Sequence, residues 1–147
     1  ASGHPSLPPA HVQAERRLIA WMLADREVAA AVERRVGSDF HVPEHAALAA
    51  CLYTFYAQGK EPDTGLFLAS LEDDGLERLA SEIALEDPPY DERALEDCLR
   101  TVSRAFLTRE IERKKEEMLR AERAGDILQA AQIANEIIAL EKQRKET

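Results

Sequence analysis

The stretch from Asp91 to Ala124 contains neither glycine nor proline, and this constrains the fold more than any other feature of the sequence. Glycine and proline are the residues that most often end helices, so the stretch predicts one helix too long for a single globular core. Its first half is amphipathic, but between Thr108 and Glu117 the only apolar residue is Ile111. A helix that is polar on all sides has left the core. This polar stalk therefore predicts two separate bodies.

The segment before the long run predicts a bundle of shorter helices. Apolar residues recur at helical spacing from Ala10 to Ala24, and Pro43 begins an apolar stretch that we expect to be the central helix. We therefore expect an all-α fold with three parts. These are a linker over residues 1–8, a compact multi-helix bundle over residues 9–107, and a long helix that continues into an antiparallel helical hairpin over residues 108–147.

The second arm of the hairpin begins after Gly125, with Asp126 as its expected N-cap, and continues to about Lys145. Its apolar residues form two neighbouring stripes at helical spacing. One stripe contains Ile127, Ala131, Ala134 and Ile138, and the other contains Ile133, Ile137 and Leu140. A hairpin can bury only one stripe on its own partner helix. The other stripe is expected to meet the bundle, a second copy of the chain or a different protein.

We expect the second of these stripes to lie against a helical surface of a partner protein, with charged neighbours that set orientation and salt dependence. The expected partner-binding residues are Ile133, Glu136, Ile137, Leu140, Lys142 and Arg144. The alternative is that the hairpin folds back onto the bundle and leaves no functional surface exposed. The polar stretch before the hairpin argues against this alternative.

Composition limits the function classes. With 19 basic and 28 acidic residues the net charge is -9, which argues against direct nucleic-acid binding because phosphate contacts need a basic face. The longest suitable uncharged run, from Ala46 to Gly59, is too short to span a membrane, and no signal peptide is visible. Cys51 and Cys98 are expected to be buried free thiols in a reducing, cytoplasmic location.

One pattern resembles a catalytic motif. His41, Glu44 and His45 match the letters H-x-x-E-H of a zinc hydrolase, which needs both histidines on one helical face. Pro43 cannot lie within such a helix, so a helix-entry loop with surface histidines is the expected structure. The metal hydrolase stays open as an alternative. No other motif predicts a catalytic residue, a metal or a cofactor.

The letters PPAHVQAERRLIAWML, from Pro8 to Leu23, resemble the opening of the C-terminal helicase-binding domain of bacterial DNA primase. That domain begins with the pattern A-E-x-x-L-[LI]-x-x-M-[LI]. The long helix and the terminal ALEKQRK are also similar to the end of primases from the Bacillus group. Similar letters open the N-terminal domain of the replicative helicase, a self-associating structural domain with a related helical fold, and this domain is the alternative.

The resemblance to primase implies a protein-interaction module without enzymatic activity of its own. It implies that the hairpin binds the N-terminal domains of the hexameric, DnaB-type replicative helicase and stimulates that helicase during primer synthesis at the replication fork. It also implies that the fragment is monomeric alone, and that its parent chain is a DNA-dependent RNA polymerase.

Overall fold

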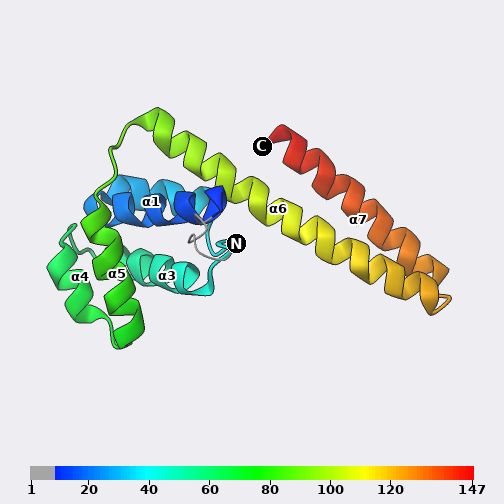
Figure 1. The fold of residues 1–147 in the computed structure, drawn as a ribbon, viewed down its shortest axis with the longest axis horizontal. Coiled ribbons are helices and arrows are strands. Elements are labelled where there is room, and N and C mark those ends of the chain that lie inside the picture. The colour runs from blue at the N-terminus through cyan, green and yellow to red at the C-terminus, as the bar shows by residue number, and fades with distance from the viewer. Residues whose placement is uncertain (1–8) are drawn as a thin grey trace, which may run out of the picture. The chain divides into compact units, whose positions relative to one another are not determined.

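The structure is a computed structural model that describes residues 9–147, so the linker expected over residues 1–8 lies outside the described residues. Over the described part the fold is all-α, as expected (Figure 1). The helices are α1 (Ala10–Ala24), α2 (Arg26–Arg35), α3 (Pro43–Ala57), α4 (Thr64–Ser70), α5 (Asp74–Glu86), α6 (Glu92–Arg123) and α7 (Ile127–Glu146). The chain divides into two compact units, one ending at Val102 and the other spanning Ser103–Thr147.

Aspartates placed just before the helices explain where several of them begin. The Asp25 carboxylate accepts a hydrogen bond from the backbone N–H of Glu27 over 2.8 Å. Asp63, Asp73 and Asp126 each accept one from the backbone N–H three residues later. Each carboxylate satisfies one of the N–H groups that the first turn of a helix leaves without a partner.

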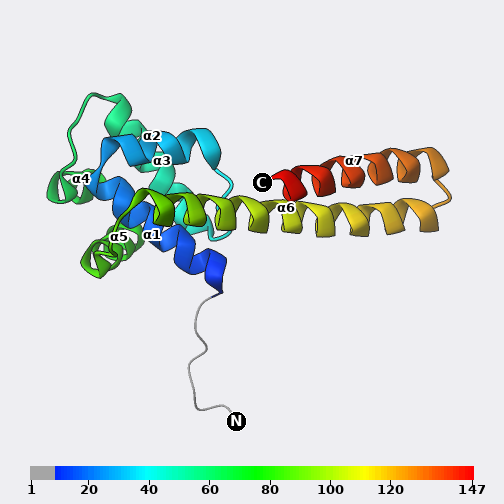
Figure 2. The same cartoon turned by 90° about the horizontal axis from the view of Figure 1, so that it is seen from above.

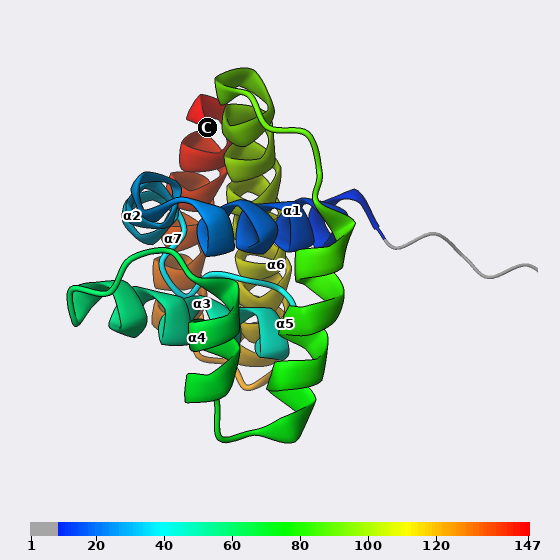
Figure 3. The same cartoon turned by 90° about the vertical axis from the view of Figure 1, so that its left-hand side faces the viewer.

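In the first unit, α1 and α3 share the centre. Helix α1 contacts α2, α3 and α5, and α3 contacts α2 and α5 (Figure 3). The short helix α4 packs on α5. Side chains from α1 to α5 and from the first part of α6 make the interior, and the largest fully buried ones include Phe67, Leu18, Met22, Leu48 and Ile83. Burial of these side chains from water is the main force that holds the unit together.

Aromatic side chains with a polar end tie the helices of the bundle to one another and to the connections between them. The Tyr53 hydroxyl donates to the carbonyl of Gly37 over 2.9 Å, and the Tyr56 hydroxyl donates to the carbonyl of Met22 over 2.5 Å. The Trp21 Nε1–H donates to the carbonyl of Pro88 over 3.1 Å. Burial raises the pKa of both tyrosines. They therefore stay protonated and act as hydrogen-bond donors.

The second unit is an antiparallel hairpin, in which the later part of α6 lies beside α7 (Figure 2). The two helices are joined at Gly125, whose φ of 76° falls in the left-handed region that glycine adopts without strain. Asp126 follows this turn at once and is the N-cap of α7, where its carboxylate accepts a hydrogen bond from the backbone N–H of Gln129. The hairpin is therefore specified by the same short sequence signal that predicted it.

Candidate protein-interaction surface

The hairpin has a small hydrophobic core of its own. Ile111 from α6 packs with Ile133 and Ile137 from α7, and all three side chains are buried. Met118, Ala121 and Leu140 pack around them and are partly buried. The prediction of a polar stalk between residues 108 and 117 is therefore wrong. This stretch is one arm of the hairpin, and its single isoleucine anchors the other arm.

Polar contacts join the two arms on both sides of this core. Lys114 Nζ lies 2.5 Å from Glu136 Oε2, and this carboxylate raises the pKa of Lys114. Towards the open end, a guanidinium N–H of Arg144 donates to the Thr108 hydroxyl over 3.2 Å. Arg104 donates to the carbonyl of Arg144 over 3.2 Å, which satisfies a carbonyl in the last turn of α7. The arms are therefore aligned along most of their length.

Outside this core, α7 carries large apolar side chains that the hairpin leaves uncovered. Leu128 is 82 % exposed, Ile127 is 68 % exposed and Ile138 is 63 % exposed. Leu119 on α6 is also exposed. We call these four residues the outer apolar face. Several exposed large aliphatic side chains on a short hairpin are typical of an interaction surface.

An apolar groove of about 390 Å³ adjoins the outer apolar face. Its walls come from both arms of the hairpin, and Lys115 is its only charged lining residue. The lining residues are Lys115, Met118, Leu119, Ala134, Ile137 and Ile138. The groove is thus a hollow between two helices, of the kind that receives side chains from a third helix.

The structure gives most of the six expected partner-binding residues a role inside the hairpin. Ile133 and Ile137 were expected on the exposed stripe, but they are 3 % and 6 % exposed because they face α6. Leu140 is partly buried beside them. Glu136 and Arg144 are engaged with α6, and Lys142 is exposed. The stripe left uncovered is the one that begins at Ile127. Partner contact by the six residues stays a prediction.

Leu119 was not among the residues predicted to form a surface. The return of apolar residues at Met118 and Leu119, after the polar stretch, is visible in the sequence. That return alone does not indicate which of the two residues faces the other arm of the hairpin. In the structure Met118 packs against the hairpin core, and Leu119 lies on the rim of the groove. The relevant signal was the spacing of both residues from Ile111.

A second polar site lies inside the first unit, where the α2–α3 connection meets α1. The buried carboxylate of Glu15 accepts a hydrogen bond from the backbone N–H of His41 over 2.5 Å and another from the backbone N–H of Val42 over 3.2 Å. It also accepts a hydrogen bond from Nδ1 of His45 over 2.7 Å. The prediction of surface histidines is wrong for His45, which is buried, whereas His41 is exposed.

This arrangement differs from the zinc hydrolase alternative. His45 directs Nδ1 to Glu15, a residue outside the motif, and Glu44 is exposed in the first turn of α3. Within residues 9–147, no three His, Cys, Asp or Glu side chains are grouped so that they could hold a metal ion. No helix in this part of the chain is both long and apolar enough to cross a membrane.

Opposing effects act on the Glu15 carboxyl. Burial raises its pKa, because a charge is costly to desolvate. The hydrogen bonds from His45 and from the backbone of His41 and Val42 lower it. The hydrogen bonds prevail and hold the pKa of Glu15 below its ordinary value of 4.5. The site is therefore a satisfied ionised carboxylate that joins the loop to α1.

Comparison with known proteins gives a consistent result. No family model matches the chain. A DNA primase of Geobacillus stearothermophilus is 40% identical over 138 residues, which span 92% of this chain and 23% of that protein. A DNA primase of Halalkalibacterium halodurans is 43% identical over 79 residues, which span 54% of this chain and 13% of that protein. The chain thus spans less than a quarter of the primase lengths that it matches. The expected resemblance is confirmed: this chain is related in sequence to part of the DNA primases of Bacillus-group bacteria.

Proposed function

We propose that this chain is the helicase-docking module of a bacterial primase, and that its hairpin binds the N-terminal domains of the hexameric replicative helicase. The observation that carries the proposal is the outer apolar face beside the groove of the hairpin. The core of the hairpin is filled by the other stripe of α7, so these side chains are left for a partner.

The outer apolar face has enough side-chain area to supply binding energy. Covering one fully exposed leucine or isoleucine contributes about 1.5–3 kcal/mol. Ile127 and Ile138 are the most suitable anchors, because they are large, highly exposed and lie about three helical turns apart on the same stripe of α7. Ala134 lies between them on this stripe and lines the groove, so a partner helix laid along the stripe would cover both anchors.

Charged residues around the face would set orientation rather than affinity. Lys115 lines the groove, and Lys142 is exposed one turn beyond Ile138. Glu136 and Arg144 hold the arms of the hairpin in line, and so preserve the shape of the groove. Ile137 lines the groove and would contact the partner there, and Ile133 packs with it in the hairpin core. Charges at the rim of an interface mainly change association rate and salt dependence.

The wider role follows from the relationship to primase. Docking would hold the primer-synthesising part of the parent chain, a DNA-dependent RNA polymerase, beside unwound template at the replication fork in the cytoplasm. It would also stimulate the helicase. In this proposal the fragment contributes binding and no chemistry, and it is monomeric when alone.

Titration calorimetry of this chain against the replicative helicase of Geobacillus stearothermophilus tests the proposal, with helicase ATPase activity measured in parallel. We expect saturable binding and increased ATPase activity. Ile138→Asp and Ile127→Asp are each expected to weaken binding by about 2 kcal/mol or more, because a charge replaces an anchor. Leu85→Asp is the matched control, since Leu85 is 85 % exposed on the other unit.

The proposal fails if both hairpin variants bind as tightly as the unaltered chain. It also fails if the unaltered chain does not bind. In that second case, rings or dimers of the chain in size-exclusion chromatography would favour the helicase-domain alternative. Circular dichroism of each variant separates loss of binding from loss of folding.

A further inference from the structure

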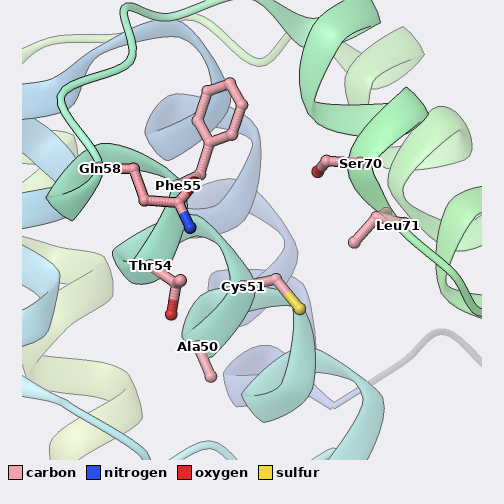
Figure 4. A pocket seen from close by; sticks show the side chains of 7 residues that line it. All are labelled: Ala50, Cys51, Thr54, Phe55, Gln58, Ser70 and Leu71. Atoms are coloured by element: carbon pink, nitrogen blue, oxygen red, sulfur yellow. The ribbon is translucent and has the colours of Figure 1, made fainter.

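The first unit has an uncharged groove that the proposed helicase docking does not use. It lies between α3 and α4, has a volume of about 310 Å³ and is shown in Figure 4. Ser70 and Leu71 form one wall, and side chains of α3 form the other (Figure 4). The α3 residues are Ala50, Cys51, Thr54, Phe55 and Gln58.

The walls of this groove carry no charge, and packing holds the Phe55 ring in place. Phe55 is buried and meets the ring of Phe67 edge to face, with ring centroids 5.4 Å apart. The Ser70 hydroxyl donates to the carbonyl of Phe67 over 2.6 Å, so it needs no further acceptor. An uncharged hollow of this size, with Phe55 and Leu71 in its walls, suits one or two aliphatic side chains of a ligand.

The surroundings of the groove are strongly acidic. The segment 60–93 contains eleven acidic and three basic residues, which gives a net charge of -8 out of the -9 of the whole chain. This segment includes α4, α5 and the turns beside them. Helix α4 itself has no charged residue, so the negative charge of this segment lies on α5, on the start of α6 and on the connections, including the one that follows Leu71.

The two ends of the groove differ in charge. Beyond Leu71 come Glu72, Asp73 and Asp74. Asp73 caps α5, whereas Glu72 and Asp74 are exposed and form no ion pair within the described residues. Beyond Gln58, at the other end, lies Lys60.

Cations balance the carboxylates at this other end. The ammonium of Lys60 lies 5.5 Å from the centroid of the Phe55 ring. Arg26 donates to the carbonyl of Lys60 and lies 3.6 Å from the Glu61 carboxylate. Among the described residues at the two ends of the groove, the exposed carboxylates without an ion pair or a helix-capping hydrogen bond are therefore those of Glu72 and Asp74, at the Leu71 end.

We propose that the α3–α4 groove docks a short basic segment of a partner protein. An aliphatic side chain of that segment lies against Phe55 and Leu71. Its lysines or arginines lie beside Glu72 and Asp74, outside the Leu71 end. The groove supplies apolar contact, and the adjacent carboxylates select a positively charged segment and fix its direction. This surface is on the first unit, so it is independent of the hairpin.

The test uses the intact chain and defined peptides. The probe is a fluorescein-labelled peptide with two adjacent leucines followed by four lysines. One comparison peptide has serines in place of the leucines, and the other has glutamates in place of the lysines. Fluorescence anisotropy measures affinity, and amide chemical shifts of the labelled protein locate the site.

We expect the leucine–lysine peptide to bind and to shift amides of residues 50–58 and 70–74. We expect the serine peptide to bind about tenfold more weakly, because the groove is left empty. The glutamate peptide is expected not to bind. Raising the salt concentration should weaken the binding of the leucine–lysine peptide, because salt screens the exposed charges involved.

Two variants place the peptide in the groove. Thr54→Trp extends a bulky ring from an exposed position on α3 into the hollow, and should weaken binding about tenfold. Glu72→Lys should weaken binding about fivefold. The control for charge is Glu116→Lys, an exposed position in the hairpin unit, which should leave affinity unchanged. Thermal melting confirms that each variant is folded.

The proposal is overturned if the leucine–lysine peptide causes no saturable shift in residues 50–74. Equal binding of the serine peptide would also overturn it, since attraction to acidic residues alone would then suffice. Shifts confined to α6 and α7 would place the peptide on the hairpin instead. Unchanged affinity in folded Thr54→Trp would exclude the groove. None of these results depends on helicase binding.

Discussion

The carboxylate of Glu15 on α1 accepts a hydrogen bond from Nδ1 of His45 on α3 over 2.7 Å, with both side chains buried. The same carboxylate holds two backbone N–H groups of the loop that leads into α3. Three donors therefore converge on one buried charge. Such a site stabilises the fold only while every member is present, because each partner left alone would be buried without a hydrogen bond.

Glu15→Gln is expected to lower the free energy of unfolding by about 2–4 kcal/mol. The glutamine side chain has only one acceptor oxygen, so it cannot satisfy all three donors, and its amide N–H₂ would face one of them. Urea denaturation at neutral pH measures the loss. Glu44→Gln is the control, since Glu44 is exposed on the same helix end as His45. A loss no larger than that of the control would contradict this account.

The same site predicts a dependence of stability on pH. The folded-state pKa of Glu15 lies below its ordinary value of 4.5, so its contribution is complete above that pH. It is lost as the pH falls from 4.5 through the folded-state pKa. The difference in unfolding free energy between the unaltered chain and Glu15→Gln should therefore shrink below pH 4.5. Parallel urea curves at each pH give this difference, and a constant difference would argue against an ionised Glu15.

Asp87 ends α5 in the left-handed conformation, with φ 40° and ψ 59°. A side chain with a Cβ is strained there, whereas glycine is not. Asp87→Gly is therefore expected to raise the free energy of unfolding by about 0.5–1 kcal/mol. Thermal unfolding measures the gain. Glu82→Gly, in the interior of the same helix, should instead destabilise by about 1 kcal/mol. Destabilisation by both would show that the Asp87 side chain has a role of its own.

The two stripes of α7 predict opposite responses to truncation. Ile133→Ala removes a side chain from the hairpin core and should destabilise the hairpin by about 2–4 kcal/mol. Ile138→Ala, on the outer apolar face, should change its stability by less than about 0.5 kcal/mol. Amide hydrogen exchange along α7 reports on this unit separately from the bundle. Equal loss of protection in both variants would contradict the assignment of inner and outer stripes.

Local chemistry explains why the helices could be predicted closely. Pro43 begins α3 and Asp25 caps α2, and the hairpin turn follows from Gly125 and Asp126. Each of these signals acts within a few residues of itself, through a backbone conformation or a hydrogen bond to the next turn. Periodicity works in the same way. It placed two apolar stripes on α7 and showed that a hairpin could bury only one.

The choice between those stripes was beyond the sequence, because adjacent stripes on one helix have nearly the same composition. Helix α6 makes the choice, since Ile111 faces Ile133 and Ile137, and Lys114 meets Glu136. A rotation of α7 that exchanged the stripes would separate these partners. The prediction of which residues a partner meets therefore depends on how two helices are rotated about their axes.

The sequence by itself determined the all-α fold, the ends of the helices, the hairpin and the relationship to primase, because these follow from signals between near neighbours or from the residues themselves. Only the tertiary structure decided that His45 is buried against Glu15 and that Ile138 remains uncovered. Both depend on which side chains meet from segments distant in the chain. Periodicity fixes the face of a helix on which a residue lies, but packing decides what that face meets.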